Sequence, residues 1–193
     1  MAKKEIIIGV TGSIAAYKAC DIINILRRGG INVTVIMTKE AKEFISPLTL
    51  QTLSNNKVYS EMFELPAERN PLHTSLADKA GVILIAPACA NIIGKLANGI
   101  CDDLLTCVVM ASDAKLLIAP AMNEKMYKNP AVQENIAKLK KRGAKFIGPV
   151  KGPLACGHDA MGHIAGVDSI VSEVKKIITP LTPALSPKGR GLR

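Results

Sequence analysis

Short apolar runs recur along the chain, and longer polar-patterned stretches separate them. The runs are EIIIGV (5–10), NVTVIM (32–37), GVILIAPA (81–88), AKLLIAPA (114–121) and AKFIGPV (144–150). They are rich in β-branched residues, and their nearly continuous hydrophobicity is typical of strands that are buried on both faces. The pattern therefore predicts five buried strands.

Segments with apolar residues at helical spacing lie between these runs, at residues 14–28, 91–97, 103–112 and 130–142. Alternating strands and helices indicate a parallel sheet. We therefore predict one α/β domain over residues 1–178: a doubly wound, Rossmann-like or flavodoxin-like parallel sheet with helices on both faces. Residues 179–193 contain three prolines and few apolar groups, and we expect a disordered C-terminal tail.

Composition disfavours several classes of protein. No apolar run approaches the roughly 20 residues of a membrane helix, and we expect a cytoplasmic protein. The five cysteines include no Cys-x-x-Cys pair, which argues against a disulfide framework and a zinc site. The net charge of +9 is spread along predicted helices, and aromatic residues make up only 3% of the chain, so we expect no nucleic-acid partner.

The turn after the first run, residues 9–14, has the sequence Gly-Val-Thr-Gly-Ser-Ile at the start of a predicted helix. Helix N-termini attract phosphates, and ligands of such sheets bind beyond the carboxyl ends of the strands. The turn lacks the third glycine of a dinucleotide fingerprint, and Thr38-Lys39 stands where an acidic residue would bind a ribose. A mononucleotide such as FMN therefore suits the turn better than NAD, although an ordinary tight connection would have a similar sequence.

Two similar turns follow the third and fourth predicted strands. Pro87 is followed by Asn91, and Pro120 is followed by Asn123, so both amides are expected at the ligand crevice. Asn123 can hold a substrate carboxylate without adding a charge that opposes loss of CO₂. The alternative is an Asx turn that caps a helix near Lys125.

One histidine and one cysteine are the best candidates for acid–base chemistry. His73 lies in NPLHTSLADKA, just before a predicted helix, whereas His158 and His163 flank a glycine-rich segment. Cys156 lies between small residues in LACGHDAMGHIAG, a setting that differs from the buried helical contexts expected for Cys101 and Cys107. A cap, a surface position or a core position with its hydrogen bonds satisfied is the alternative for His73.

Five motifs occur in order along the chain: VTGSIAAYK, LHTSLADKA, APACANIIGKLANGICDDLLT, APAMNEKM and GPLACG. Over roughly residues 6–178 they resemble the homo-oligomeric flavin-containing cysteine decarboxylases. The resemblance implies an FMN enzyme that removes CO₂ from a C-terminal cysteine. The GPLACG segment favours the cysteine of 4'-phosphopantothenoylcysteine, in coenzyme A synthesis, over one at the end of a peptide.

The resemblance also implies site residues. His73 would be the catalytic base, Asn123 the carboxylate anchor with Met122 beside it, and Cys156 a substrate-contacting proton donor on a flexible flap. The substrate thiol would be oxidised to a thioaldehyde, CO₂ would leave, and the resulting enethiol would be reduced. FMN would be bound by Gly12, Ser13, Ile14, Thr38, Cys89, Ala90, Asn91, Ile92 and Ala121.

The resemblance further implies a homotrimer, or a multiple of one, with FMN between subunits. Bacterial relatives usually continue into a ligase domain, so a separate phosphopantothenate–cysteine ligase is an expected partner. The chain is compatible with a stand-alone enzyme, a fragment or a disrupted frame. It also has His163 where the flap motif normally has a basic residue.

Two further interpretations remain open. A flavin-binding protein without turnover would keep the fold, but the joint presence of His73, Asn123 and Cys156 argues against it. An NAD-dependent dehydrogenase is disfavoured by the missing third glycine and the missing ribose-binding acid.

Overall fold

The computed structural model describes residues 5–63, 71–153, 157 and 159–178. In this part of the chain, six parallel strands form one sheet in the order β3-β2-β1-β4-β5-β6. The predicted doubly wound parallel sheet is confirmed. Its strands are β1 (Glu5–Val10), β2 (Val33–Met37), β3 (Val58–Tyr59), β4 (Ala80–Ala88), β5 (Lys115–Pro120) and β6 (Lys145–Phe146).

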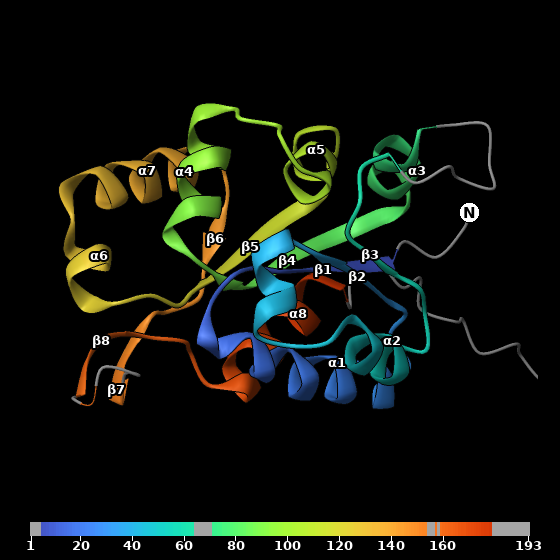
Figure 1. Cartoon of the computed structure of the whole chain (residues 1–193), viewed down its shortest axis with the longest axis horizontal. Coiled ribbons are helices and arrows are strands. Elements are labelled where there is room, and N and C mark those ends of the chain that lie inside the picture. Colours follow the sequence, from blue (N-terminus) through green and yellow to red (C-terminus); the bar gives the residue numbers. More distant parts are fainter. Residues whose placement is uncertain (1–4, 64–70, 154–156, 158, 179–193) are drawn as a thin grey trace, which may run out of the picture.

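Helices cover both faces of the sheet (Figure 1). One face carries α1 (Lys18–Arg28), α2 (Pro47–Ser54) and α8 (Val167–Ile178). The other carries α3 (Leu72–Lys79), α4 (Ala90–Asn98), α5 (Leu104–Met110) and α7 (Pro130–Lys141), and the short α6 (Glu124–Lys128) leads into α7. No helix among these described residues is long and apolar enough to span a bilayer.

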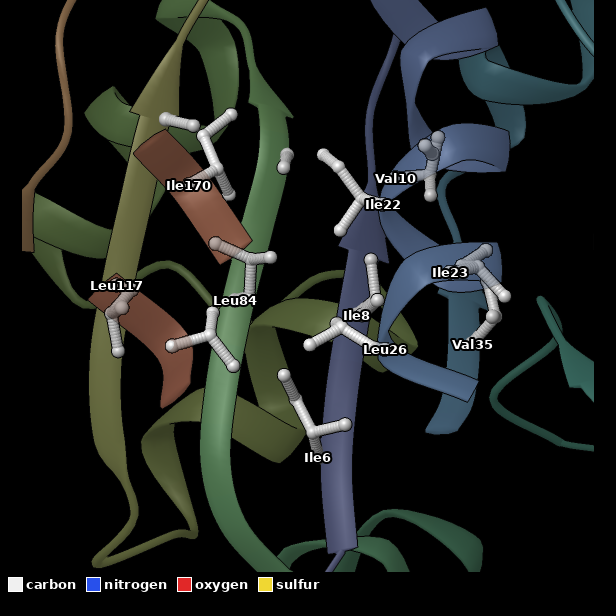
Figure 2. Packing of buried hydrophobic residues seen from close by; sticks show 14 of the residues in the cluster. Ile6, Ile8, Val10, Ile22, Ile23, Leu26, Val35, Leu84, Leu117 and Ile170 are labelled. Atoms are coloured by element: carbon white, nitrogen blue, oxygen red, sulfur yellow. The ribbon is translucent and has the colours of Figure 1, made fainter. Parts of the chain in front are cut away.

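The core divides along β1, whose side chains alternate between the two faces. Figure 2 shows Ile6 and Ile8 with Ile22 and Leu26 of α1, while Ile7 belongs to the cluster on the opposite face. All of these side chains are at most 1% exposed. Because its apolar residues are covered on both faces, β1 provides a fixed base for the loop that follows it.

Two predicted elements differ in detail from the structure. The predicted helix at 14–28 begins as a 3₁₀ turn, η1 (Ile14–Tyr17), because Ser13 caps it and the Ala16 amide bonds to the Ser13 carbonyl. The predicted strand at 144–150 is interrupted after Phe146: Gly148 has φ +79°, and the proline that follows it has no N–H to donate to a ladder.

An antiparallel hairpin lies beyond that interruption, and the sequence pattern did not predict it. It pairs β7 (Val150–Pro153) with β8 (Asp159–His163). In Figure 1 it lies beside α6, at the end of the molecule where the strands of the main sheet terminate. The short strand β3 and the helix α2 were also not predicted, since neither has a long periodic apolar pattern.

Candidate active site

The winding of the sheet reverses between its central strands. From β1 the chain goes outward to β2 and β3 and then returns to form β4 on the other side of β1. The carboxyl ends of β1 and β4 therefore lie side by side, and their loops turn to opposite faces of the sheet. This reversal point is where the fold opens a crevice for a ligand.

The buried hydroxyl of Thr11 joins these two strand ends. It donates a hydrogen bond to the Pro87 carbonyl (2.7 Å) and accepts one from the Cys89 amide (3.1 Å). The ladder between β4 and β5 is irregular between Ile85 and Ala88, where Pro87 has no N–H to donate. The side chain of Thr11 thus completes backbone pairing that the sheet leaves open.

Further backbone bonds align the neighbouring strand ends. The Thr38 amide, at the end of β2, bonds to the Val10 carbonyl (3.0 Å), and the Ala121 amide, after β5, bonds to the Ala88 carbonyl (3.0 Å). The loops after β1, β2, β4 and β5 are thereby fixed to one another along a single edge of the sheet.

The loop after β1 is a tight cradle. Ser13 is the N-cap of η1, and its hydroxyl accepts a hydrogen bond from the Ala15 amide (3.4 Å). A Cβ atom at Gly12 would lie 2.6 Å from the Cβ of Glu40, which belongs to the turn after β2, so this turn approaches more closely than any side chain at Gly12 would permit. The glycine therefore lets the loops after β1 and β2 pack together.

Thr38 contributes an unusual polar atom to this edge. The residue is 7% exposed, and its Oγ1 atom is buried without a hydrogen-bond partner in the described structure. A buried hydroxyl without a partner destabilises a protein by about 1–3 kcal/mol. A buried polar atom without a partner is unusual in a folded protein.

The turn after β4 carries four of the predicted cofactor residues. Cys89 is the N-cap of α4, and Ala90, Asn91 and Ile92 form its first turn. The Ile92 side chain is 2% exposed and belongs to the hydrophobic core, so only its backbone can meet a ligand. The helix N-terminus also supplies backbone N–H groups at this turn.

Asn123 has the capping role that the sequence left open. Its Oδ1 atom accepts a hydrogen bond from the Lys125 amide (2.8 Å) at the start of α6, so the Asx turn is confirmed. The cap does not exclude a role in binding. It fixes the carbonyl end of the amide against the helix, and the donor atom Nδ2 lies at the other end.

The hairpin β7–β8 is docked on the residues beside Asn123. The Met122 amide bonds to the Gly162 carbonyl (3.1 Å), and the Met161 amide bonds to Glu124 Oε1 (3.4 Å). Gly162 has φ +134°, and a Cβ atom there would lie 2.2 Å from the Met122 carbonyl oxygen. Only glycine permits this close approach.

These loops enclose a cavity of about 540 Å³, within the usual range for small-molecule sites. Seven of the predicted site residues line it: Gly12, Ser13, Ile14, Cys89, Ala121, Met122 and Asn123. The structure therefore brings together residues that are more than 100 positions apart in the sequence.

Other predicted residues do not line this cavity, among them Thr38, Ala90, Asn91 and Ile92. His73 is on α3, which lies in Figure 1 at the opposite end of the molecule from β7 and β8. Cys156 lies outside the described residues, as does the predicted tail at 179–193.

The expectation that Cys101 lies in a buried helix was wrong: it is exposed in the loop before α5, because the helix begins only at Leu104. Burial raises the pKa of the nearby Cys107 thiol, with a contribution from Cys101.

The cavity also has wall residues that sequence reasoning did not assign. Tyr17, Lys18 and Met126 line it, as do Pro153 and His163 of the hairpin. Among the described residues that line the cavity, Lys18 carries the one full charge, and its Nζ atom lies 5.7 Å from the centre of the Tyr17 ring. The motif VTGSIAAYK contained both residues, but only the helix geometry shows that they face the cavity.

Comparison with known proteins agrees with this geometry. The Flavoprotein family model matches residues 1–179. The chain is 46% identical over 184 residues to the coenzyme A biosynthesis bifunctional protein CoaBC of Bacillus subtilis, covering 94% of this chain and 45% of that protein. It therefore spans about half the length of this relative and of several others. It is 45% identical over 175 residues to a probable phosphopantothenoylcysteine decarboxylase of Streptococcus mutans, covering 90% of this chain and 98% of that one.

Two solved structures are also similar. The FMN-dependent cysteine decarboxylase SpaF has a TM-score of 0.82 and 27% identity, over 93% of this chain and 98% of that one. A cysteine-to-serine mutant of a PPC decarboxylase, complexed with pantothenoylaminoethenethiol, has a TM-score of 0.80 and 31% identity, over 90% and 97%. Both comparisons show that the chain shares its fold with these proteins.

The Thr11 bridge gives a direct test of this architecture. Thr11→Val keeps the shape of the side chain but leaves the Pro87 carbonyl and the Cys89 amide without a partner, so we expect it to lower the free energy of unfolding by about 2–4 kcal/mol. Thr11→Ser keeps the hydroxyl and loses one methyl group, and we expect a loss of about 1 kcal/mol. Urea denaturation measures both values. Equal stability of the two variants would show that the bridge does not hold the strand ends together.

Proposed function

The chain belongs to the Flavoprotein family, and on that premise we propose that it is an FMN-dependent decarboxylase of 4'-phosphopantothenoylcysteine. The observation that carries the proposal is the cavity that joins the loop at Ser13, the turn at Cys89 and the amide of Asn123. The first two are suited to a flavin nucleotide, and the third is suited to a carboxylate. A cofactor and an acid substrate would therefore meet in one place.

The described residues fit FMN. The buried, unpartnered Oγ1 of Thr38 would gain a hydrogen bond from a polar group of the cofactor. Gly12 keeps this loop free of a side chain, and the Ser13 hydroxyl, which accepts from the Ala15 amide, would donate its hydrogen to a phosphate. Lys18 on the cavity wall supplies a compensating positive charge.

Bound FMN would supply reversible oxidation of the substrate thiol, which makes the neighbouring carboxylate a group that leaves as CO₂. The protein groups would position the substrate for that change. Asn123 Nδ2 would donate to the carboxylate, and the cap bond from the Lys125 amide keeps the Asn123 side chain in one orientation. Since Asn123 carries no charge, it would hold the carboxylate while stabilising the anion less than a lysine or arginine would.

His73 would act as the base in the site of a neighbouring subunit. Its helix lies far from the cavity of its own chain, so a base at this position requires a second copy. Apolar side chains at the mouth of the cavity support such an assembly: Ile14 is 59% exposed, Tyr17 55% and Met126 49%. Exposed apolar surface of this kind is typical of an interface. We therefore propose a homotrimer, or a multiple of one, with the cofactor between subunits.

The phosphopantothenoyl substrate is favoured over a peptide cysteine by the relatives. A similar chain of nearly the same length carries the name phosphopantothenoylcysteine decarboxylase, and the longer relatives are bifunctional proteins of coenzyme A biosynthesis. A phosphopantothenate–cysteine ligase, fused or separate, would supply the substrate. We also propose that the protein acts in the cytoplasm.

We expect the purified protein to be yellow, and to release CO₂ from 4'-phosphopantothenoylcysteine with formation of 4'-phosphopantetheine. The visible spectrum, CO₂ release and product mass measure the three outcomes. A yellow protein that decarboxylates only peptides ending in cysteine would replace the proposed substrate. A colourless protein that does not bind added FMN would contradict the cofactor assignment.

We expect Thr38→Val to separate cofactor binding from stability. The apoprotein should be at least as stable as the unsubstituted one, because the substitution removes a buried hydroxyl without a partner. Its affinity for FMN should fall about 5- to 10-fold, the effect of losing one hydrogen bond. Fluorescence titration of FMN measures the affinity, and Thr34→Val, a substitution near the start of β2, is the control that should leave it unchanged. Equal FMN affinity of Thr38→Val would remove this residue from the site.

Substitutions of the two proposed acid–base groups should interrupt the reaction at different points. His73→Asn should lower CO₂ release at least about 100-fold while FMN remains bound, the size of effect expected for a general base. Cys156→Ser should still release CO₂ but should accumulate the enethiol, since a hydroxyl is a much weaker acid than a thiol. CO₂ assays and product mass distinguish the two blocks. Turnover at the unsubstituted rate in either variant would remove that residue from the mechanism.

A further inference from the structure

His163 holds the two strands of the hairpin together at the edge of the cavity. It is the last residue of β8, and its Nδ1 atom lies 2.8 Å from the carbonyl oxygen of Pro153, the last residue of β7. The ring packs closely on β7, since a Cβ atom at Gly152 would lie only 3.1 Å from His163 Cγ. The side chain is half-buried, and its position is fixed by these two contacts.

The partner of Nδ1 determines which ring nitrogen carries the proton. A carbonyl oxygen can only accept a hydrogen bond, so we assign the hydrogen of the neutral ring to Nδ1. The other nitrogen, Nε2, then has a lone pair and is a hydrogen-bond acceptor. An arginine or lysine at this position would be able only to donate.

The hairpin bonds bring His163 to the wall of the cavity that Asn123 also lines. His163 follows Gly162, whose carbonyl oxygen accepts the bond from the Met122 amide, and both His163 and Asn123 line the cavity. A substrate whose carboxylate is held by Asn123 must extend its acyl arm along the walls of the same cavity. The pantothenoyl arm contains two amide N–H groups and a hydroxyl, all of which can donate.

We propose that His163 is a specificity-determining residue, whose Nε2 accepts a hydrogen bond from an amide N–H of the substrate's acyl arm. This inference rests on the proposed function, because it concerns the arm that distinguishes 4'-phosphopantothenoylcysteine from a free cysteine. The bond between His163 Nδ1 and the Pro153 carbonyl supports this role, because it selects the tautomer that leaves Nε2 as an acceptor.

Two substitutions separate binding by Nε2 from the structural tie at Nδ1. In His163→Asn, the amide nitrogen can take the place of Nδ1 and keep the bond to Pro153, but no acceptor remains at the position of Nε2. In His163→Gln, the longer side chain can return an acceptor near the position of Nε2, but it loses the bond to Pro153. His163→Asn therefore removes the acceptor at Nε2, whereas His163→Gln removes the bond from Nδ1 to Pro153.

We expect His163→Asn to raise KM for 4'-phosphopantothenoylcysteine about 5- to 10-fold with kcat within about twofold, and His163→Gln to recover most of the lost affinity. Calorimetry with 4'-phosphopantetheine should give the same order of affinities without turnover. Two substrate analogues, each with one of the two arm amides replaced by an ester, locate the contact. The analogue that lacks the N–H bound by His163 should bind equally well to the unsubstituted protein and to His163→Asn, because neither complex can form the bond.

Each other outcome is decisive. If His163→Asn keeps the KM and product affinity of an active unsubstituted protein, the inference is wrong while the proposed function stands. If His163→Gln is the more impaired variant, the residue has only a structural role in the hairpin. If the unsubstituted protein neither turns over the substrate nor binds the product, the proposed function fails first, and the inference fails with it.

Discussion

The hydroxyl of Thr11 is the interaction on which the site depends. Where the winding of the sheet reverses, two central strands end side by side, and Pro87 removes one backbone donor there. Thr11 compensates by bonding to the Pro87 carbonyl and the Cys89 amide. The loops after β1 and β4 are therefore held together, and the cavity opens between them. A ligand that binds there meets groups that are already fixed.

The rest of the cavity is formed by the neighbouring strand ends and by the hairpin that packs on them. Bonds from the Thr38 amide to Val10 and from the Ala121 amide to Ala88 extend the fixed edge to the ends of β2 and β5. The hairpin then docks on this edge through Gly162, which fits against the Met122 carbonyl only because it has no side chain. The proposed cofactor side of the site thus rests on the sheet, while the proposed substrate side rests on the small hairpin and on the residues at 122–124.

Two residues combine a structural role with a proposed functional one, because each has two polar ends. Asn123 caps α6 with its carbonyl oxygen, and its amide nitrogen can face a carboxylate. His163 ties the hairpin with one nitrogen and can face the substrate with the other. A structural bond at one end fixes the orientation of the other, which lowers the entropy lost on binding. For this reason the capping role of Asn123 and its proposed binding role are compatible.

The sequence by itself determined the parallel sheet and much of the first half of the site, since the apolar runs locate the strands and the residues directly after them must lie at one edge. It did not locate the hairpin, because β7 and β8 are short, have no clear alternation of apolar and polar residues, and are held by contacts with residues 122–124. It also could not show that Lys18 faces the cavity, or that His73 lies away from the cavity of its own chain. Strand edges follow from local pattern, whereas these placements depend on how distant segments pack, and that was decided only by the tertiary structure.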